Sequence, residues 1–181
     1  MVLGGDPALV PDSLVAKFAR EVTDHWSEVQ YGPLWRGLAP RILSLLERAP
    51  DEMLLRGLTD AHFADWRDEQ RVAVREALCG MLARAVTGDR SARDVATLVG
   101  AAAHVDQDLV PWLDYLDTLG ADADAGIARL ARHWSAGDEP TLWWHPSDPA
   151  APIRDWLYSD ALYERLSRAG DQLAMIEIMT S

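Results

Sequence analysis

Cysteine, lysine and asparagine are nearly absent from this chain of 181 residues. Cys79 is the single cysteine, which excludes an internal disulfide framework and fits a reducing compartment. Lys17 is the only lysine beside sixteen arginines, and no asparagine occurs. Such a bias indicates a high-GC genome, as in a high-GC bacterium, and carries no inference about chemistry.

Long hydrophobic runs are missing as well. None approaches the roughly 20 residues that a membrane-spanning helix needs. The first residues, "MVLGGDPALV", lack the basic and apolar regions of a signal peptide. We therefore expect a soluble cytoplasmic protein with no membrane partner. Hydrophobic residues at 49% and charged residues at 25% are typical of a single folded domain.

Basic charge is scarce, and the net charge of -12 argues against a nucleic-acid partner, because phosphate binding needs a basic surface. Residues 1–90 carry 11 basic and 14 acidic side chains, whereas residues 91–181 carry 6 and 15. These aspartates are interpreted either as helix caps on a solvated face or as a docking surface for a basic protein. Between residues 94 and 128 there is no lysine or arginine, but seven aspartates occur: Asp94, Asp106, Asp108, Asp114, Asp117, Asp122 and Asp124.

Apolar residues recur at helical spacing along almost the whole chain, and no convincing strand alternation interrupts them. Ser91 with Asp94 resembles a capping box, and Ser159 is a predicted helix cap. Short connections between the predicted helices imply antiparallel hairpins. Helices are predicted over about 11–29, 33–49 (beginning at Pro33 or Pro40), 68–86, 91–102, 109–119, 124–134 and 159–169.

Four tryptophans recur at similar intervals: Trp26, Trp66, Trp112 and Trp156 are separated by 40, 46 and 44 residues. HEAT and armadillo repeats have periods of about 40–47 residues. In period and in its helical stripes, the segment 68–170 resembles a short stack of such repeats. The resemblance implies an all-α fold, an irregular HEAT-like array of antiparallel helical hairpins within one domain, 1–181. Residues 1–60 are expected to form a helical cap on residues 61–181, and a compact helical bundle is the alternative.

Motifs of enzyme chemistry are absent: the sequence has no G-x-S-x-G, H-E-x-x-H, G-x-x-x-x-G-K or C-x-x-C. Asp114 and Asp117 share a helix face, but no substrate-binding group accompanies them, and Cys79 lies on an apolar helix stripe. We therefore predict no catalytic residue, no metal and no cofactor, and favour a non-enzyme. The histidines lie on different predicted elements without ligand spacing: His25, His62, His104, His133 and His145.

The connection over 135–152 is rich in proline and tryptophan. Loops longer than about 12–15 residues are usually functional or disordered. Either its tryptophans pack on the neighbouring helices and order the crossover, or one is exposed as an aromatic binding anchor. The candidate binding residues are Trp143, Trp144 and His145 in this connection, with Asp106, Asp108, Asp114, Asp117, Asp122 and Asp124 beside it.

We predict a non-enzymatic helical protein-interaction module that binds a protein with a basic surface. A specific form of this hypothesis is an immunity protein or antitoxin, which would cover the basic surface of a nuclease. One alternative is a small-ligand or metal-dependent helical-bundle enzyme with a pocket lined by histidines and by Trp26, Trp134 and Trp143. Another is a structural or assembly subunit, for which a homodimer is an option.

Overall fold

The computed structural model of the protein describes residues 7–21, 27–138, 140, 142, 144, 148, 150–171, 175–176 and 178–179. Within these ranges the chain forms helices and no β-strand, which confirms the predicted all-α fold. The same ranges hold no helix with the length and apolar character needed to cross a membrane. The α-helices are α1 (Asp12–Arg20), α2 (Glu28–Arg48), α3 (Asp68–Thr87), α4 (Ala92–Ala103), α5 (Val110–Thr118), α6 (Asp124–Ser135), α7 (Ala151–Leu157) and α8 (Asp160–Ala169), and the 3-10 helices are η1 (Pro7–Leu9), η2 (Glu52–Leu58), η3 (Phe63–Asp65) and η4 (Ala121–Ala123).

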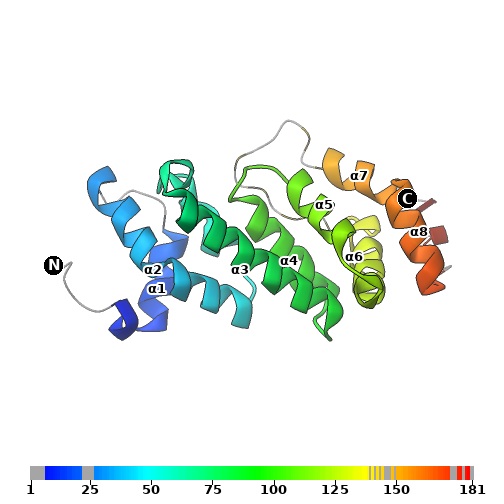
Figure 1. The fold of residues 1–181 in the computed structure, drawn as a ribbon, viewed down its shortest axis with the longest axis horizontal. Coiled ribbons are helices and arrows are strands. Elements are labelled where there is room, and N and C mark those ends of the chain that lie inside the picture. The colour runs from blue at the N-terminus through cyan, green and yellow to red at the C-terminus, as the bar shows by residue number, and fades with distance from the viewer. Residues whose placement is uncertain are drawn as a thin grey trace.

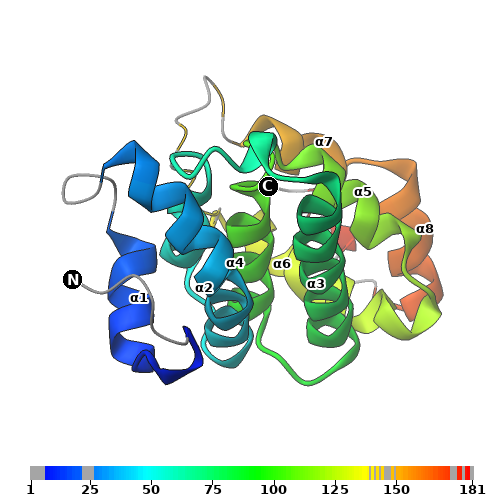
Figure 2. The same ribbon diagram turned by 60° about the vertical axis from the view of Figure 1, so that its left-hand side comes forward.

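The helices follow one another in chain order along the long axis of the molecule, from α1 and α2 at one end to α7 and α8 at the other (Figure 1). Neighbours along this axis contact one another: η2 packs on α1 and α4, and α6 packs on α3, α4 and α8. The turned view shows α3, α4 and α6 side by side in the middle of the array (Figure 2). One cluster of buried apolar side chains extends from Val15 in α1 to Leu166 in α8.

The predicted helix caps at Ser91 and Ser159 are confirmed. The Ser91 hydroxyl accepts a hydrogen bond from the backbone N–H of Asp94 at 3.1 Å, and the Ser159 hydroxyl accepts one from Leu162 at 3.2 Å. Each bond satisfies a backbone donor that the first turn of a helix leaves without a partner. Gly170 ends α8 with a φ of 68°, a left-handed conformation that glycine adopts without steric cost.

The N-terminal helices differ from the prediction. The expected helix over 11–29 is interrupted, because α1 ends at Arg20 and Glu21 is extended, and α2 begins only at Glu28. The predicted start of the second helix at Pro33 or Pro40 was also wrong, since α2 contains both prolines. Both are exposed, so water can bind the carbonyls that lose their helical partner.

Aromatic packing explains why α2 stays helical in spite of its prolines. Tyr31 and Trp35 of α2 are 1% and 0% exposed. Phe18 of α1 lies with its ring centroid 5.5 Å from that of Tyr31 and 5.8 Å from that of Trp35. Burial of large side chains of this kind contributes several kcal/mol, which offsets the cost of about 3 kcal/mol for an internal proline.

Candidate functional site

Asp124 lies at the first residue of α6 and is 5% exposed. Its Oδ1 accepts a hydrogen bond from Nη1 of Arg165 at 2.7 Å, and its Oδ2 accepts one from Nε of Arg168 at 3.1 Å. Both arginines come from α8. This carboxylate therefore ties α6 to α8 inside the protein, which differs from the expectation that it belongs to a solvated acidic face.

Two other candidate aspartates also bind groups of the chain itself. Asp106 forms a bidentate ion pair with Arg75 of α3, whose Nη1 donates to Oδ2 at 3.0 Å, and the Asp106 side chain is 13% exposed. Asp117 is half-buried and accepts a hydrogen bond from the indole Nε1 of Trp156 at 3.1 Å. Burial raises the pKa of Asp117, while the bond from Trp156 opposes that shift.

The remaining three candidate aspartates are exposed. Asp108 accepts a hydrogen bond from the backbone N–H of Val110 at 2.9 Å and so caps the start of α5. Asp114 and Asp122 have no ion-pair partner among the described residues. The acidic segment thus divides into four candidate aspartates that bond to groups of the chain and two exposed ones, Asp114 and Asp122, without an ion-pair partner among the described residues.

Part of the connection between α6 and α7 packs on α4 and on His104 at its C-terminal end. Leu142 is 7% exposed, and a Cβ atom placed on Gly100 of α4 would lie 3.0 Å from Cβ of Pro140. The ring of Trp144 meets that of His104 edge to face, with centroids 5.2 Å apart. The position of Trp144 therefore agrees with the alternative in which the tryptophans of this loop pack on neighbouring helices. The other two candidates of the loop, Trp143 and His145, lie outside the described residues.

His104 closes the C-terminal end of α4 beneath this loop. It is 3% exposed, and its Nδ1 lies 2.7 Å from the carbonyl oxygen of Gly100, which makes Nδ1 the protonated ring nitrogen. Burial lowers the pKa of His104, so the neutral ring is favoured at neutral pH. The histidine and the tryptophan are packed against one another rather than arranged around an open site.

A second acidic surface, unexpected from the sequence, covers α7 and α8. Tyr158 and Tyr163 are 61% and 56% exposed. The exposed carboxylates of Asp155 and Asp160 lie three residues before Tyr158 and Tyr163, at helical neighbour spacing, and the exposed Glu164 lies four residues after Asp160. We call these five residues the acid–tyrosine surface. The helical stripe could have indicated it: Leu162 and Leu166 form the buried side of α8, which leaves the intervening tyrosine and glutamate outside.

The carboxylates of the acid–tyrosine surface have no ion-pair partner in the described part of the chain. The nearby arginines are engaged elsewhere. Their contacts are Arg129 with the Gly88 carbonyl, Arg132 with Asp171, Arg154 with Asp148, and Arg165 and Arg168 with Asp124. The negative charge of this end of the molecule therefore remains available to an external cation.

Groups suited to catalysis are dispersed. Over the described ranges, no three His, Cys, Asp or Glu side chains gather as a metal-ion site would require. Burial raises the pKa of the Cys79 thiol, which disfavours the nucleophilic thiolate. His62 is exposed. The Nδ1 atom of His133 lies 3.4 Å from Oδ2 of Asp138. His25 lies outside the described residues.

No protein-family model, curated protein or solved structure matches this chain. Its function has to be inferred from its own geometry and charge. The feature that combines exposed aromatic area with uncompensated charge is the acid–tyrosine surface on α7 and α8.

Proposed function

We propose that this protein is a non-enzymatic interaction module that binds a protein with a basic surface through the acid–tyrosine surface. The observation that supports the proposal is the pair of exposed tyrosines, Tyr158 and Tyr163, each preceded at helical neighbour spacing by an exposed carboxylate that has no ion-pair partner among the described residues. Asp114 on α5 and Asp122 on η4 are two further exposed carboxylates in this half of the chain.

Tyrosine and carboxylate would contribute differently to such an interface. A buried tyrosine at the centre of an interface is often worth 2 kcal/mol or more by alanine substitution, roughly a thirtyfold change in Kd. Exposed ion pairs contribute about 0.2–1 kcal/mol each. The tyrosines would therefore supply most of the affinity, while the carboxylates would accelerate association and select against acidic partners.

The charge points to one class of partner. Proteins that act on nucleic acids carry lysine- and arginine-rich surfaces, because they must neutralise phosphates. An acidic module that covers such a surface would block access to nucleic acid, which is the activity of an immunity protein or antitoxin. We propose a basic nuclease as the partner to test first.

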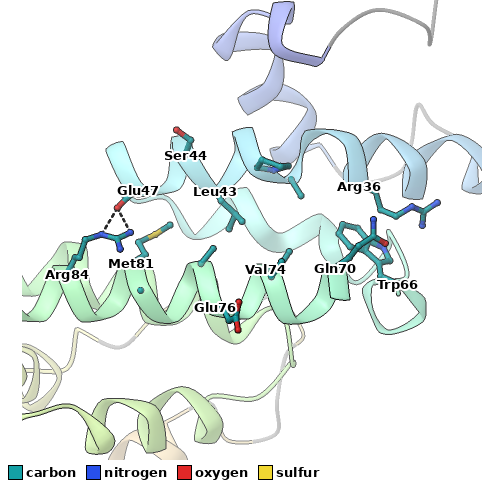
Figure 3. A pocket seen from close by; sticks show the side chains of 15 residues that line it. Arg36, Leu43, Ser44, Glu47, Trp66, Gln70, Val74, Glu76, Met81 and Arg84 are labelled. Carbon is teal, nitrogen blue, oxygen red and sulfur yellow. Dashed lines mark hydrogen bonds and ion pairs between the residues drawn. The ribbon is translucent and has the colours of Figure 1, made fainter. Parts of the chain in front are cut away.

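We further propose that the fold is a HEAT-like stack. The order of the helices along the long axis supports this proposal (Figure 1). The helices α2 and α3 run in the same direction, because Arg36 and Gln70 lie at one end of the pair and Glu47 and Arg84 at the other (Figure 3). Stacked hairpins place equivalent helices of successive repeats in this relation.

Photo-crosslinking in the host cell tests the interface. Replacement of Tyr163 by p-benzoylphenylalanine should give adducts with a basic protein, and the same replacement at Val72, which is 50% exposed on α3, serves as the control position. The captured protein is then purified, and its affinity for the wild-type chain is measured at low and high salt.

Neutralising the carboxylates of the acid–tyrosine surface tests the role of charge against a matched control. The substitutions Asp155→Asn, Asp160→Asn and Glu164→Gln together should weaken binding about tenfold at low salt, and the loss should shrink at high salt. Neutralising three exposed carboxylates elsewhere (Asp65→Asn, Glu69→Gln and Asp89→Asn) should have a much smaller effect. Equal losses in the two triple variants, or adducts only from position 72, would contradict the proposal.

A second candidate function is that of an assembly subunit. The exposed apolar side chains of Leu9, Leu14 and Val29, which are 80%, 55% and 84% exposed, lie at the opposite end of the array. Apolar ends of helical stacks favour contact with a further layer. Sedimentation velocity over a wide concentration range would show a dimer in this case, and Leu14→Glu should abolish it.

A further inference from the structure

A groove lies between α2 and α3, with a volume of about 540 Å³. Small or flexible apolar side chains line much of it. Leu43 of α2 and Val74 and Met81 of α3 lie between the two helices (Figure 3), and Ala39 and Ala77 also belong to the lining. Ala77 is exposed, whereas Val74 and Met81 are 6% and 4% exposed. Small side chains on facing helices leave room for larger apolar groups from outside.

The groove has the length of a short helix. Its lining extends from Arg36 to Glu47 on α2 and from Gln70 to Arg84 on α3. At a rise of about 1.5 Å per residue, these segments are about 16 and 21 Å long. This is three to four turns of helix, roughly 11–14 residues.

One end of the groove is electrically neutral. Glu47 Oε1 accepts hydrogen bonds from Nη2 of Arg84 at 2.6 Å and from its Nε at 3.0 Å. The missing side chain at Gly80 makes room for this arginine, because a Cβ atom there would lie 3.2 Å from the Arg84 Nη1. The carboxylate and the guanidinium thus satisfy one another across the groove.

The opposite end carries Arg36, a cation without a carboxylate partner among the described residues. The guanidinium of Arg36 lies over the ring of Trp66, with Cζ 5.9 Å from the ring centroid. No carboxylate of the described residues pairs with Arg36. Trp66 is 5% exposed and donates its Nε1–H to the carbonyl of Ala61 at 2.9 Å, so the ring is a fixed platform for the arginine.

We propose that the α2–α3 groove binds an amphipathic α-helix of a partner protein, which places bulky apolar side chains on the floor and a carboxylate beside Arg36. A helix presents side chains at i, i+3, i+4 and i+7 along one face, which matches an elongated apolar groove between two helices. Arg36 at one end and the Glu47–Arg84 pair at the other give the bound helix a direction. Glu76 also lines the groove, has no ion-pair partner among the described residues, and disfavours a carboxylate near the middle of the bound helix. This groove is a separate surface from the acid–tyrosine surface and does not depend on the function proposed for it.

Selection from a displayed library of helical peptides tests the groove. The full-length protein is immobilised, and peptides of about 14 residues with randomised positions on one helix face are selected against it. Enriched peptides should carry Leu, Ile, Phe or Trp at helical spacing and Asp or Glu near one end. Two variants are selected in parallel: Ala77→Trp, which fills the floor, and Arg36→Glu, which reverses the charge at the end.

The variants separate this site from other contacts. Ala77→Trp should weaken an enriched peptide at least about tenfold, whereas Ala161→Trp on α8, also at an exposed alanine, should leave its affinity unchanged. On Arg36→Glu the acidic preference at the peptide end should change to Lys or Arg. Unchanged far-UV circular dichroism of each variant shows that it is folded.

Three results would overturn the proposal. They are enrichment of the same peptides on Ala77→Trp, an acidic preference that persists on Arg36→Glu, and the absence of any helical consensus. Saturable binding of dodecanoate that Ala77→Trp abolishes, without a peptide consensus, would assign the groove to small amphiphiles instead. Loss of the acid–tyrosine carboxylates should not affect peptide binding, so the two surfaces are tested independently.

Discussion

Replacement of Arg165 by methionine probes a buried cation that bonds to three separate groups of the chain. The Arg165 side chain is 5% exposed and bonds to Asp124 at the start of α6. Its Nη2 also donates to the carbonyl oxygens of Asp117, at 2.7 Å, and of Leu119. These carbonyls end α5, where a helix leaves acceptors without backbone partners. One guanidinium therefore joins three helices.

The expected loss in the free energy of unfolding follows from this arrangement. Removal of one partner from a buried ion pair costs about 3–5 kcal/mol, because the other charge remains buried. Arg168 still lies 3.1 Å from Asp124, which places the expected cost near the lower limit, about 3 kcal/mol. Unfolding entropies of about 2.1 cal/mol/K per residue convert this loss into a fall in Tm of about 8 °C for 181 residues.

Urea unfolding, followed by tryptophan fluorescence and far-UV circular dichroism, measures this loss. Arg154→Met is the control, since its ion pair with Asp148 has side-chain exposures of 52% and 49% and should contribute less than about 1 kcal/mol. The double variant Asp124→Leu/Arg165→Met should lose less free energy of unfolding than the two single variants lose together. The difference should be about 1–3 kcal/mol. A loss below about 1 kcal/mol for Arg165→Met, with an unchanged m value, would refute the reasoning.

Three further predictions concern packing and ionisation. Gly126→Ala should cost about 2 kcal/mol or more in urea unfolding, because a Cβ atom there would lie 1.9 Å from the carbonyl oxygen of Val86; Gly37→Ala, with nothing within 4 Å, should instead stabilise α2 by about 0.5–1 kcal/mol. Burial raises the pKa of Asp117 in the folded state, so its ionisation lowers stability as pH rises above the ordinary value of 3.8. Asp117→Asn should therefore be at least as stable as wild type at neutral pH and lose this advantage below that value; a stability difference independent of pH would contradict the assignment. Burial likewise raises the pKa of Cys79, so a disulfide reagent should react more slowly with the folded protein than with the urea-unfolded protein. Equal reaction rates would contradict the raised pKa of this thiol.

The helices of the middle and C-terminal parts were predictable, apart from α7, because their signals are local. The apolar stripe over 68–86 and the caps at Ser91 and Ser159 specify where α3, α4 and α8 begin or end. The break between α1 and α2 was not predictable in this way, because the apolar spacing continues across it. The start of α2 was predicted wrongly at Pro33 or Pro40 for a related reason. The free-energy cost of these prolines is offset by burial of aromatic side chains against α1, and the apolar spacing of one helix does not reveal that burial.

The candidate site was predictable only in part. The sequence indicated an excess of carboxylates in the second half of the chain, and exposed carboxylates are found there on α5, η4, α7 and α8. It did not indicate which of them are exposed. Asp106 and Asp124 pair with arginines 31 and 41 residues away in the sequence, and these partners become known only from the packing of α3 and α8.

The sequence by itself determined the helical class, most helix boundaries and the sign of the charge, because spacing, caps and composition act over a few residues. Only the tertiary structure decided which charges neutralise one another, which tryptophan faces a histidine, and where a groove remains between α2 and α3. These outcomes depend on contacts between residues far apart in the chain, and the energies of those contacts arise only when whole helices pack. The physical division is between short-range conformational preference and long-range complementarity.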